Sequence, residues 1–341
     1  MLISFCIPTY NRCHYLILAL NDLLQQAINL NVENSIEICI SDNASTDNTK
    51  KKLEELKAKY PQFKIHTKYN ETNIGPDLNF IQVLKMGSGD FLILKGDDDY
   101  LKPNGLSILL KLINENPSID FFISDVEIVN TNREFIKHVN YLRNSKNEII
   151  VDFTNEIEAR NYFALCENIL ALGSFISGVV IKREAIENIK IDPCFIGTNY
   201  SFLFYFWKYL SEGHKLKYNR TAYIQATVGT ESTYGKGIAR DAIDLNIIAL
   251  IADYFFKDSY LNQDIKNVVN RMYKYYAYIP INQKKDFNTK LYPALFKTNH
   301  PLIQEIKSNA SLFSFIKYAL YSIIPSTIII KLKKLLKKNQ H

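Results

Sequence analysis

Three consecutive aspartates, Asp97, Asp98 and Asp99, are the residues of this chain best suited to chemistry. They follow an apolar run at 91–94 that is typical of a short buried strand. Carboxylates this close repel one another, so a bound cation would explain why three of them stand together. Hard oxygen ligands favour Mg²⁺ or Mn²⁺, which commonly bridge protein carboxylates to substrate phosphates. The alternative is an acidic turn before the next helix, because aspartate is common in turns and caps.

Two further polar clusters stand just after predicted strands. The segment Pro8–Arg12 follows the apolar run at 2–7, and its backbone groups and the Tyr10 ring could hold a flat base or a ribose. Asp42 follows the run at 36–40, where a carboxylate could accept hydrogen bonds from such a ligand. Each cluster also has a structural interpretation, since the first could cap a helix and the second could be a turn residue.

The first third of the chain must position these clusters, and it alternates between apolar runs and helical periodicity. The predicted strands are 2–7, 36–40, 63–67, 91–94 and 119–123, and the predicted helices are 15–30, 46–60, 76–86 and 103–114. This alternation predicts βαβ units, a largely parallel sheet and right-handed crossovers. Ligands of such sheets bind beyond the carboxyl ends of the strands, so we expect the three clusters to converge on one crevice.

The rest of the chain is less regular. The predicted elements are a hairpin or flap over 126–151, a helix over 156–169, a strand over 175–181, a helix over 200–210, a mobile loop over 227–240 and mostly helix from 241. The last segment is apolar over 312–330 and lysine-rich over 331–338, which favours an amphipathic tail on an anionic membrane surface. The alternative is a helix packed on the domain with a solvated basic end.

Composition excludes several classes of protein. The chain has 341 residues, 47% of them hydrophobic, which supports a substantial core rather than disorder. Its net charge of +6 is most basic at the C-terminus, so we expect no nucleic-acid partner. We expect no signal peptide, because a strand begins almost at once. The cysteines lack metal-ligand spacing and are predicted to be buried thiols of a cytoplasmic protein: Cys6, Cys13, Cys39, Cys166 and Cys194.

A set of ordered motifs in the first hundred residues resembles the family 2 glycosyltransferases. The motifs are Ile7-Pro8-Thr9-Tyr10-Asn11-Arg12, Ser41-Asp42-Asn43-Ala44-Ser45-Thr46-Asp47, Asn73-Ile74-Gly75, Gly89-Asp90-Phe91 and Gly96-Asp97-Asp98-Asp99. The pattern Asn73-x-Gly75-x-Asp77-x-Asn79 is most similar to an abequosyltransferase-like branch that decorates bacterial surface polysaccharides. The resemblance implies a GT-A fold over 1–225, with a nucleotide-binding half (1–125) and an acceptor half (126–225). The remainder, 226–341, would be the mobile loop and a helical C-terminal extension.

The resemblance also implies roles for single residues. Tyr10 would stack on the nucleobase beside the Pro8–Thr9 backbone, Asp42 would bind the base, and Asp97 would lie near the ribose. Asp98 would hold Mn²⁺ or Mg²⁺ on the diphosphate, and Asp99 would be a second metal ligand or orient the sugar. The remaining expected nucleotide-sugar-binding residues are Asn11, Arg12, Asn73 and Gly75.

Inverting transfer needs a base that deprotonates the acceptor hydroxyl. The Gly-Glu-Asp motif of the family aligns here with Gly197-Thr198-Asn199, and asparagine cannot accept a proton at neutral pH. The expected base is therefore Asp192 or an acidic residue supplied from elsewhere in the chain, with Asp99 and Asp125 as weaker candidates.

The function implied is metal-dependent, inverting transfer of a sugar from a nucleotide-sugar donor to a glycan or lipid-linked acceptor in polysaccharide biosynthesis. The protein would be cytoplasmic and peripheral on the inner face of the cell membrane. The alternative is a non-catalytic nucleotide-sugar-binding scaffold of the same fold, which the missing Glu-Asp pair favours. A dinucleotide-binding oxidoreductase is disfavoured because no G-x-G-x-x-G follows the first strand.

Overall fold

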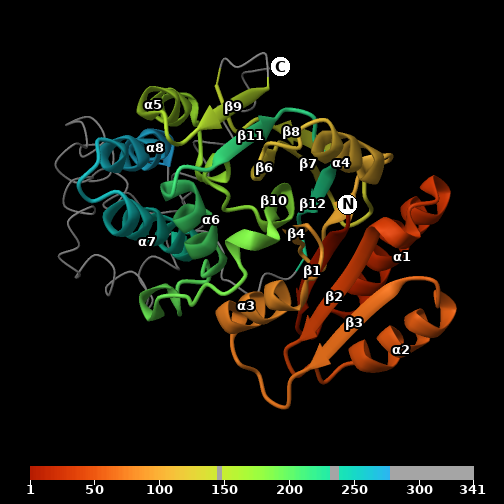
Figure 1. The fold of residues 1–341 in the computed structure, drawn as a ribbon. Coiled ribbons are helices and arrows are strands. Elements are labelled where there is room, and N and C mark those ends of the chain that lie inside the picture. Colours follow the sequence, from red (N-terminus) through yellow and green to blue (C-terminus); the bar gives the residue numbers. More distant parts are fainter. Residues whose placement is uncertain (144–147, 231–237, 277–341) are drawn as a thin grey trace, which may run out of the picture.

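A computed structural model describes residues 1–143, 148–230 and 238–276, and its centre is an eight-stranded sheet (Figure 1). The strand order is β3-β2-β1-β4-β10-β6-β11-β9, in which β9 and β10 run against the other six. The strands are β1 (Ile3–Thr9), β2 (Ile36–Asp42), β3 (Lys64–Tyr69), β4 (Phe91–Leu94), β6 (Phe121–Ser124), β9 (Ile149–Asp152), β10 (Val179–Lys182) and β11 (Lys215–Asn219). The expected α/β architecture with a mostly parallel sheet is confirmed.

Helices cover this sheet. They are α1 (Cys13–Leu30), α2 (Thr49–Lys59), α3 (Pro76–Met86), α4 (Gly105–Asn114), α5 (Glu156–Leu165), α6 (Phe202–Ser211), α7 (Ile238–Phe255) and α8 (Leu261–Tyr276). Figure 1 shows α1 and α2 to one side of β1, β2 and β3, with α3 to the other. The later helices α5, α6, α7 and α8 gather at the far end of the molecule from α2.

A second, four-stranded sheet has the order β5-β12-β7-β8, made of β5 (Tyr100–Leu101), β7 (Val126–Val129), β8 (Phe135–Val139) and β12 (Ile224–Thr227). The predicted hairpin is confirmed for β7 and β8, which pair antiparallel. The prediction was wrong for 149–151, because this segment belongs to β9 and joins the large sheet. The predicted strand over 175–181 begins only at Val179, after a short 3₁₀ turn at Ile176–Gly178.

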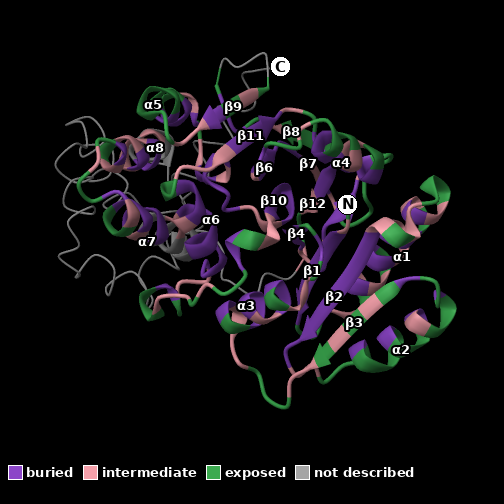
Figure 2. Ribbon diagram, in the orientation of Figure 1, coloured by how far each residue is buried: buried purple, intermediate pink, exposed green. Residues whose placement is uncertain are grey.

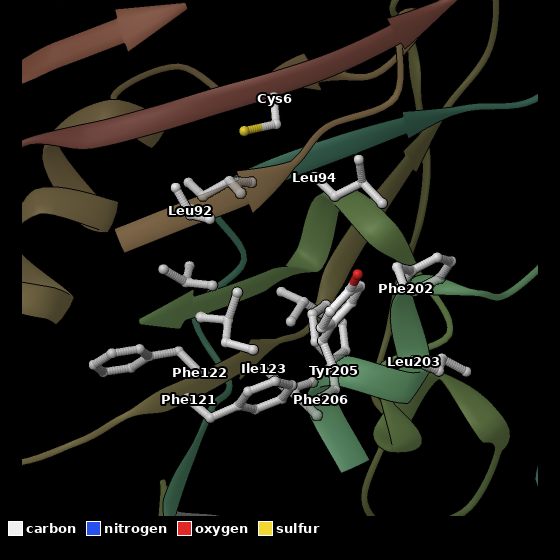
Figure 3. Close-up of a cluster of buried hydrophobic side chains, with 14 of the residues drawn as sticks. Cys6, Leu92, Leu94, Phe121, Phe122, Ile123, Phe202, Leu203, Tyr205 and Phe206 are labelled. Atoms are coloured by element: carbon white, nitrogen blue, oxygen red, sulfur yellow. The ribbon is translucent and has the colours of Figure 1, made fainter. Parts of the chain in front are cut away.

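The core lies between the large sheet and the helices, as the buried residues of Figure 2 show. Helix α6 buries most of its side chains because it packs between the sheet and α7. Phe206 of α6 meets Phe121 of β6 edge to face, with ring centroids 4.9 Å apart (Figure 3). This packing fixes the N-terminal end of α6, which starts at Phe202.

The C-terminal expectations are only partly within the described residues. Helices α7 and α8 confirm the predicted helical character of 241–276, but residues 238–240 are already helical and not part of a loop. The segment 231–237 and the predicted basic tail at 312–338 lie outside the described residues. None of the helices in the described ranges is both long and apolar enough to cross a bilayer.

The thiols differ from the prediction at two positions. Cys6, Cys39 and Cys166 are buried and free, as expected. Cys13 is only half-buried and Cys194 is exposed, because they lie on a helix face and a loop rather than in strands.

A buried carboxylate ties the amino-terminal edge of the sheet together. Glu37 of β2 accepts hydrogen bonds from the Ser4 hydroxyl, from the Ser88 amide and hydroxyl, and from the Gly89 amide. Burial alone would raise the pKa of Glu37, but these donors outweigh it and hold the pKa below its usual value. Glu37 thereby joins β1, β2 and the turn before β4, the strand that ends at the aspartates.

Candidate active site

A cleft with a volume of about 810 Å³ lies beyond the carboxyl ends of β1, β2 and β4. These strand ends supply Pro8, Thr9, Tyr10, Arg12, Asn43, Gly96, Asp97, Asp98 and Asp99 to its lining. The other walls are Asn73, Pro76, Asn79, Phe80, Ser174, Phe175, Ile176, Asn199, Tyr200, Phe202 and the segment 226–230. The structure therefore brings the predicted clusters after β1 and β4 to one crevice, where α/β sheets bind their ligands, and the end of β2 contributes Asn43 rather than Asp42 to its lining.

Arg12 neutralises the aspartate cluster. Its Nε lies 2.9 Å from Oδ1 of Asp97, and its Nη2 donates to Oδ2 of Asp98. The Thr9 hydroxyl adds a 2.7 Å hydrogen bond to the other oxygen of Asp97. The positive charge of Arg12 reduces the repulsion between the adjacent carboxylates, because one guanidinium can form ion pairs with two carboxylates at once.

The turn that carries the aspartates is held by the preceding lysine and by two hydroxyl groups from later in the chain. Lys95 is fully buried and donates to the backbone oxygens of Gly96 and Asp99, at 2.9 and 2.6 Å. The Ser177 hydroxyl donates to Oδ2 of Asp99, and the Thr230 hydroxyl donates to Oδ2 of Asp98 at 2.7 Å. Residues from three distant parts of the chain thus fix the cluster.

Burial sets the protonation behaviour of two of the aspartates. It raises the pKa of Asp97 to about 6, although the Arg12 guanidinium acts in the opposite direction. Burial and the negative charge of Asp98 raise the pKa of Asp99 to about 7. Burial also lowers the pKa of Lys95, against the attraction of the carboxylates. Burial therefore favours the neutral form of both carboxyl groups, and more strongly for Asp99, which lacks the Arg12 guanidinium as a partner.

Several predicted site residues support the cleft without lining it. The Asp42 carboxylate accepts the Ser45 amide at 3.0 Å, and it is Asn43 that faces the cleft. Asn11 accepts the Thr46 amide at 2.7 Å, which joins the loops after β1 and β2. Gly75 has a φ of +82°, which suits glycine, and precedes α3.

The segment before α3 is bound to the end of β2. Asn43 Nδ2 donates to Asn73 Oδ1 at 2.9 Å and to the Gly75 carbonyl at 3.3 Å. Asn79 is buried and exchanges hydrogen bonds with Ser41 of β2, through its hydroxyl at 2.6 Å and its carbonyl at 3.1 Å. The spacing of Asn73, Gly75 and Asn79 therefore serves to position this wall of the cleft.

The structure does not bring Asp192 or Asp125 to the cleft lining. The Asp192 carboxylate caps a short 3₁₀ helix through the Cys194 amide and accepts the Tyr254 hydroxyl at 2.7 Å. Asp125 is buried among the Tyr141 amide, the Tyr218 hydroxyl and His138. Of the predicted bases, Asp99 is the one in the cleft.

Sequence reasoning missed the far wall. Ser174, Phe175 and Ile176 lie in a segment that the pattern presented as a plain strand, and Thr230 lies in what was expected to be a loop. No signal in the sequence marks this wall, because its hydrogen bonds to the aspartates come from Ser177 and Thr230, which lie 78 and 132 residues further along the chain.

The donor set suits a hard divalent cation. Arg12 and Thr230 both hold Oδ2 of Asp98, so Oδ1 has no protein partner among the described residues. Within the described ranges no three acidic, histidine or cysteine side chains form a complete metal site. One carboxylate is nevertheless enough where a substrate phosphate and water complete the coordination of Mg²⁺ or Mn²⁺.

Comparison with known proteins gives a consistent result. The sequence model for "Glycosyl transferase family 2" matches residues 4–170. An abequosyltransferase, RfbV of Salmonella typhimurium, is 33% identical over 282 residues, which cover 79% of this chain and 80% of the relative. A GalNAc(5)-diNAcBac-PP-undecaprenol beta-1,3-glucosyltransferase of Campylobacter jejuni is 26% identical over 98% of this chain and 97% of its own.

Two solved structures share the fold. Staphylococcus aureus TarS 1-349, solved with UDP-GlcNAc, superposes with a TM-score of 0.59 at 18% identity, over 86% of this chain and 78% of its own. The mannosyltransferase PcManGT of Pyrobaculum calidifontis, solved with GDP-Man and Mn²⁺, gives 0.51 at 14% identity, over 98% and 87%. At these identities the likeness concerns the fold alone.

Proposed function

This chain belongs to glycosyl transferase family 2 and is a glycosyltransferase, and on this premise we propose that it moves a sugar from a nucleotide-sugar donor to a saccharide or lipid-linked glycan of a cell-surface polysaccharide. The observation that carries the proposal is the cluster of Asp97, Asp98 and Arg12 beyond the carboxyl end of β4, inside a cleft large enough for a nucleotide-sugar. The Campylobacter jejuni relative acts by its name on an undecaprenol-linked glycan, which supports a lipid-linked acceptor.

The nucleotide would lie over the ends of β1 and β2. The Tyr10 side chain is 37% exposed and lines the cleft, so its ring is available to stack on a base beside Pro8 and Thr9. Asp97 would accept a hydrogen bond from the ribose, since its carboxyl group lines the cleft. Asn11, Asp42, Asn73 and Gly75 would shape the base and ribose pocket through the loops that they hold together.

The diphosphate would lie beside Asp98 and Arg12. Mn²⁺ or Mg²⁺ held by Asp98 would supply the positive charge that stabilises the departing nucleoside diphosphate. Asp99 is adjacent, but its carboxylate is already held by Ser177, so we assign the ion to Asp98 first and to Asp99 second. Arg12 is positioned to donate to phosphate oxygens from the same side, because its guanidinium already reaches Oδ2 of Asp98.

The attacking hydroxyl must lose its proton to a carboxylate if the transfer inverts the anomeric centre. Asp99 is the candidate base in the cleft, and its raised pKa of about 7 suits proton exchange near neutral pH. Asp192 could take this role only if its hydrogen bonds to Tyr254 and the Cys194 amide were given up.

A melting-temperature panel tests the proposal. The protein would be heated with UDP, CDP, GDP or dTDP, each with Mn²⁺ or with EDTA. We expect one base to raise the melting temperature, and Mn²⁺ to enlarge the rise, because a ligand present at about 100 times its Kd stabilises the native state by about 2.7 kcal/mol. The matching nucleoside is the control, since it lacks the diphosphate.

Three outcomes of the panel are informative. No shift with any diphosphate contradicts nucleotide-sugar binding, and a shift that EDTA leaves unchanged contradicts the metal. Binding without transfer or hydrolysis of the matching nucleotide-sugar would favour the scaffold alternative.

We also propose that the enzyme works peripherally on the inner face of the cell membrane, with residues 312–338 as the interfacial segment. The support is the run of lysines after an apolar stretch in the sequence. The full chain should sediment with anionic vesicles, and a chain that ends after Asn309 should not. Equal recovery of both with vesicles would contradict the tail as anchor.

A further inference from the structure

We propose that Asp77 is a positioning residue that holds the segment 197–201 so that the Asn199 carboxamide can bind a hydroxyl group of a sugar ring in the cleft. The inference rests on the proposed function and adds a sugar subsite to it. Nothing in the aspartate cluster or at the nucleotide end of the cleft accounts for this part of the wall.

Three backbone amides converge on the Asp77 carboxylate. Oδ2 accepts the amides of Gly197 and Asn199 at 2.8 and 2.9 Å, and Oδ1 accepts the amide of Ser201 at 2.9 Å. The Ser201 hydroxyl returns a 3.1 Å hydrogen bond to the Asp77 carbonyl. Asp77 is only 4% exposed, so these donors rather than water solvate its charge.

The segment adopts an unusual backbone to make these contacts. Gly197 and Asn199 both have left-handed φ angles, +90° and +62°. Such alternation turns successive amides toward one side, which creates a concave anion site that Asp77 fills. The conformation therefore depends on a carboxylate at position 77, because without it three amides lose their acceptor, and the amide of buried Ser201 would have no water to replace it.

The segment presents a free hydrogen-bonding group to the cleft. Asn199 lines the cleft, and its carboxamide makes no hydrogen bond within the described ranges. The Tyr200 hydroxyl is fixed by Asp244 of α7 at 2.5 Å, which holds the segment from its other side. A carboxamide with one acceptor and two donors suits sugar hydroxyls, which both donate and accept.

A second free group lies in the lining of the same cleft. Ser174 is buried, and its hydroxyl has no hydrogen-bond partner in the described part of the chain. Phe175 lines the cleft as well and is partly exposed, so it offers apolar surface. An apolar wall with a few placed polar groups is what small-ligand sites require, so the Asn199 end of the cleft fits a sugar ring.

Asp77 also couples this end of the cleft to the nucleotide end. It stands in the first turn of α3, between Asn73 and Asn79, which are bound to Asn43 and Ser41 at the end of β2. One short segment thus fixes the spacing between the base pocket and the sugar subsite. A disturbance at Asp77 should move the sugar subsite without moving the nucleotide pocket.

The test compares Asp77→Asn, Asn199→Ala and the double variant, with the diphosphate found by the melting panel and nucleotide-sugars of the same base as probes. Each single variant should bind the nucleoside diphosphate within about twofold of the wild type. If the subsite takes the donor sugar, the extra affinity of a nucleotide-sugar over its diphosphate should fall about tenfold. If it takes the acceptor, donor hydrolysis should persist while transfer falls about tenfold.

The double variant separates positioning from a general loss of stability. If Asp77 acts through Asn199, the double variant should be no worse than the worse single variant, whereas independent effects would multiply. Asp152→Asn is the matched control, because Asp152 also accepts a backbone amide, from Thr154 at 2.9 Å, but lies outside the cleft lining. Multiplying effects, or an equal loss of diphosphate and sugar binding in Asp77→Asn, would overturn the proposal. If wild-type protein binds no diphosphate, the proposed function fails instead.

Discussion

The Asp98→Asn variant should fold normally and lose at least about a thousandfold of the transfer rate. The Asp98 carboxylate has an oxygen without a protein partner among the described residues, and its side chain is 21% exposed. Asparagine keeps the shape and the contact with the Thr230 hydroxyl, but it removes the charge that a divalent ion needs. The rate would be measured with the nucleotide-sugar whose base the melting panel identifies.

A second readout makes this expectation independent of the acceptor. The part of the melting-temperature rise that depends on Mn²⁺ should vanish in Asp98→Asn, while the part that survives EDTA should remain. Asp258→Asn is the control, because Asp258 is an exposed residue between α7 and α8. Retention of the Mn²⁺-dependent rise in Asp98→Asn would show that the ion is held elsewhere.

Glu37→Ala should lower the free energy of unfolding by about 3–5 kcal/mol. The substitution removes the acceptor of the buried Ser4 hydroxyl, of the buried Gly89 amide and of the Ser88 amide. Glu71→Ala, at an exposed position, should change stability by less than about 0.5 kcal/mol. Urea titration followed by circular dichroism measures both. A loss of similar size in both variants would contradict the assignment to Glu37.

The charge of Glu37 can be separated from its hydrogen bonds. Glu37→Gln retains an oxygen for the amides and an NH₂ group for the Ser88 hydroxyl, so its effect at pH 7 should be smaller than that of alanine. Because the pKa of Glu37 is lower in the folded than in the unfolded state, its charge stabilises the fold above the unfolded pKa of about 4.3. This stabilisation is lost as the pH falls through the folded pKa. The difference between wild type and Glu37→Gln should therefore shrink on acidification below about pH 4, and a constant difference would contradict it.

The first 125 residues were predictable because their signals are local. Each apolar run from β1 to β4 is followed by a helix of the right period, and right-handed βαβ connections then leave little choice of topology. Even here some helix boundaries differ between prediction and structure, for chemical reasons. The predicted helix 46–60 begins only at Thr49, because the Asp47 carboxylate takes the amides of Cys13 and Thr49.

The second half was less predictable because its strands are short and pair over long distances. β11 reads Lys-Leu-Lys-Tyr-Asn, which suggests an exposed segment, yet Lys217 is buried and forms a 2.6 Å ion pair with Glu148. β12 is recognisable only through its partners β5 and β7, which both lie far before it in the chain. Tertiary context rather than propensity decides such strands.

The candidate site likewise has a part that was predictable from the sequence and a part that was not. The residues at the ends of β1, β2 and β4 were found from their types and places, since parallel strands end together. Arg12 was expected at the nucleotide, and its pairing with Asp97 and Asp98 emerged only from the fold. The contact of Asp77 with the segment 197–201 could not be inferred from the sequence, because a carboxylate in the first turn of a helix is expected for its effect on the helix end alone.

The turn that carries the aspartates is held by side chains that lie far toward the C-terminus and are therefore synthesised late. Ser177 and Thr230 hold Asp99 and Asp98, although the stretch that matches the family ends at residue 170. A nascent chain that ends at residue 170 already contains β1, β2 and β4. It lacks the two hydroxyl groups that bind the aspartates and the three amides that bind the Asp77 carboxylate. The pocket is therefore complete only once residue 230, about two thirds of the way along the polypeptide, has been synthesised.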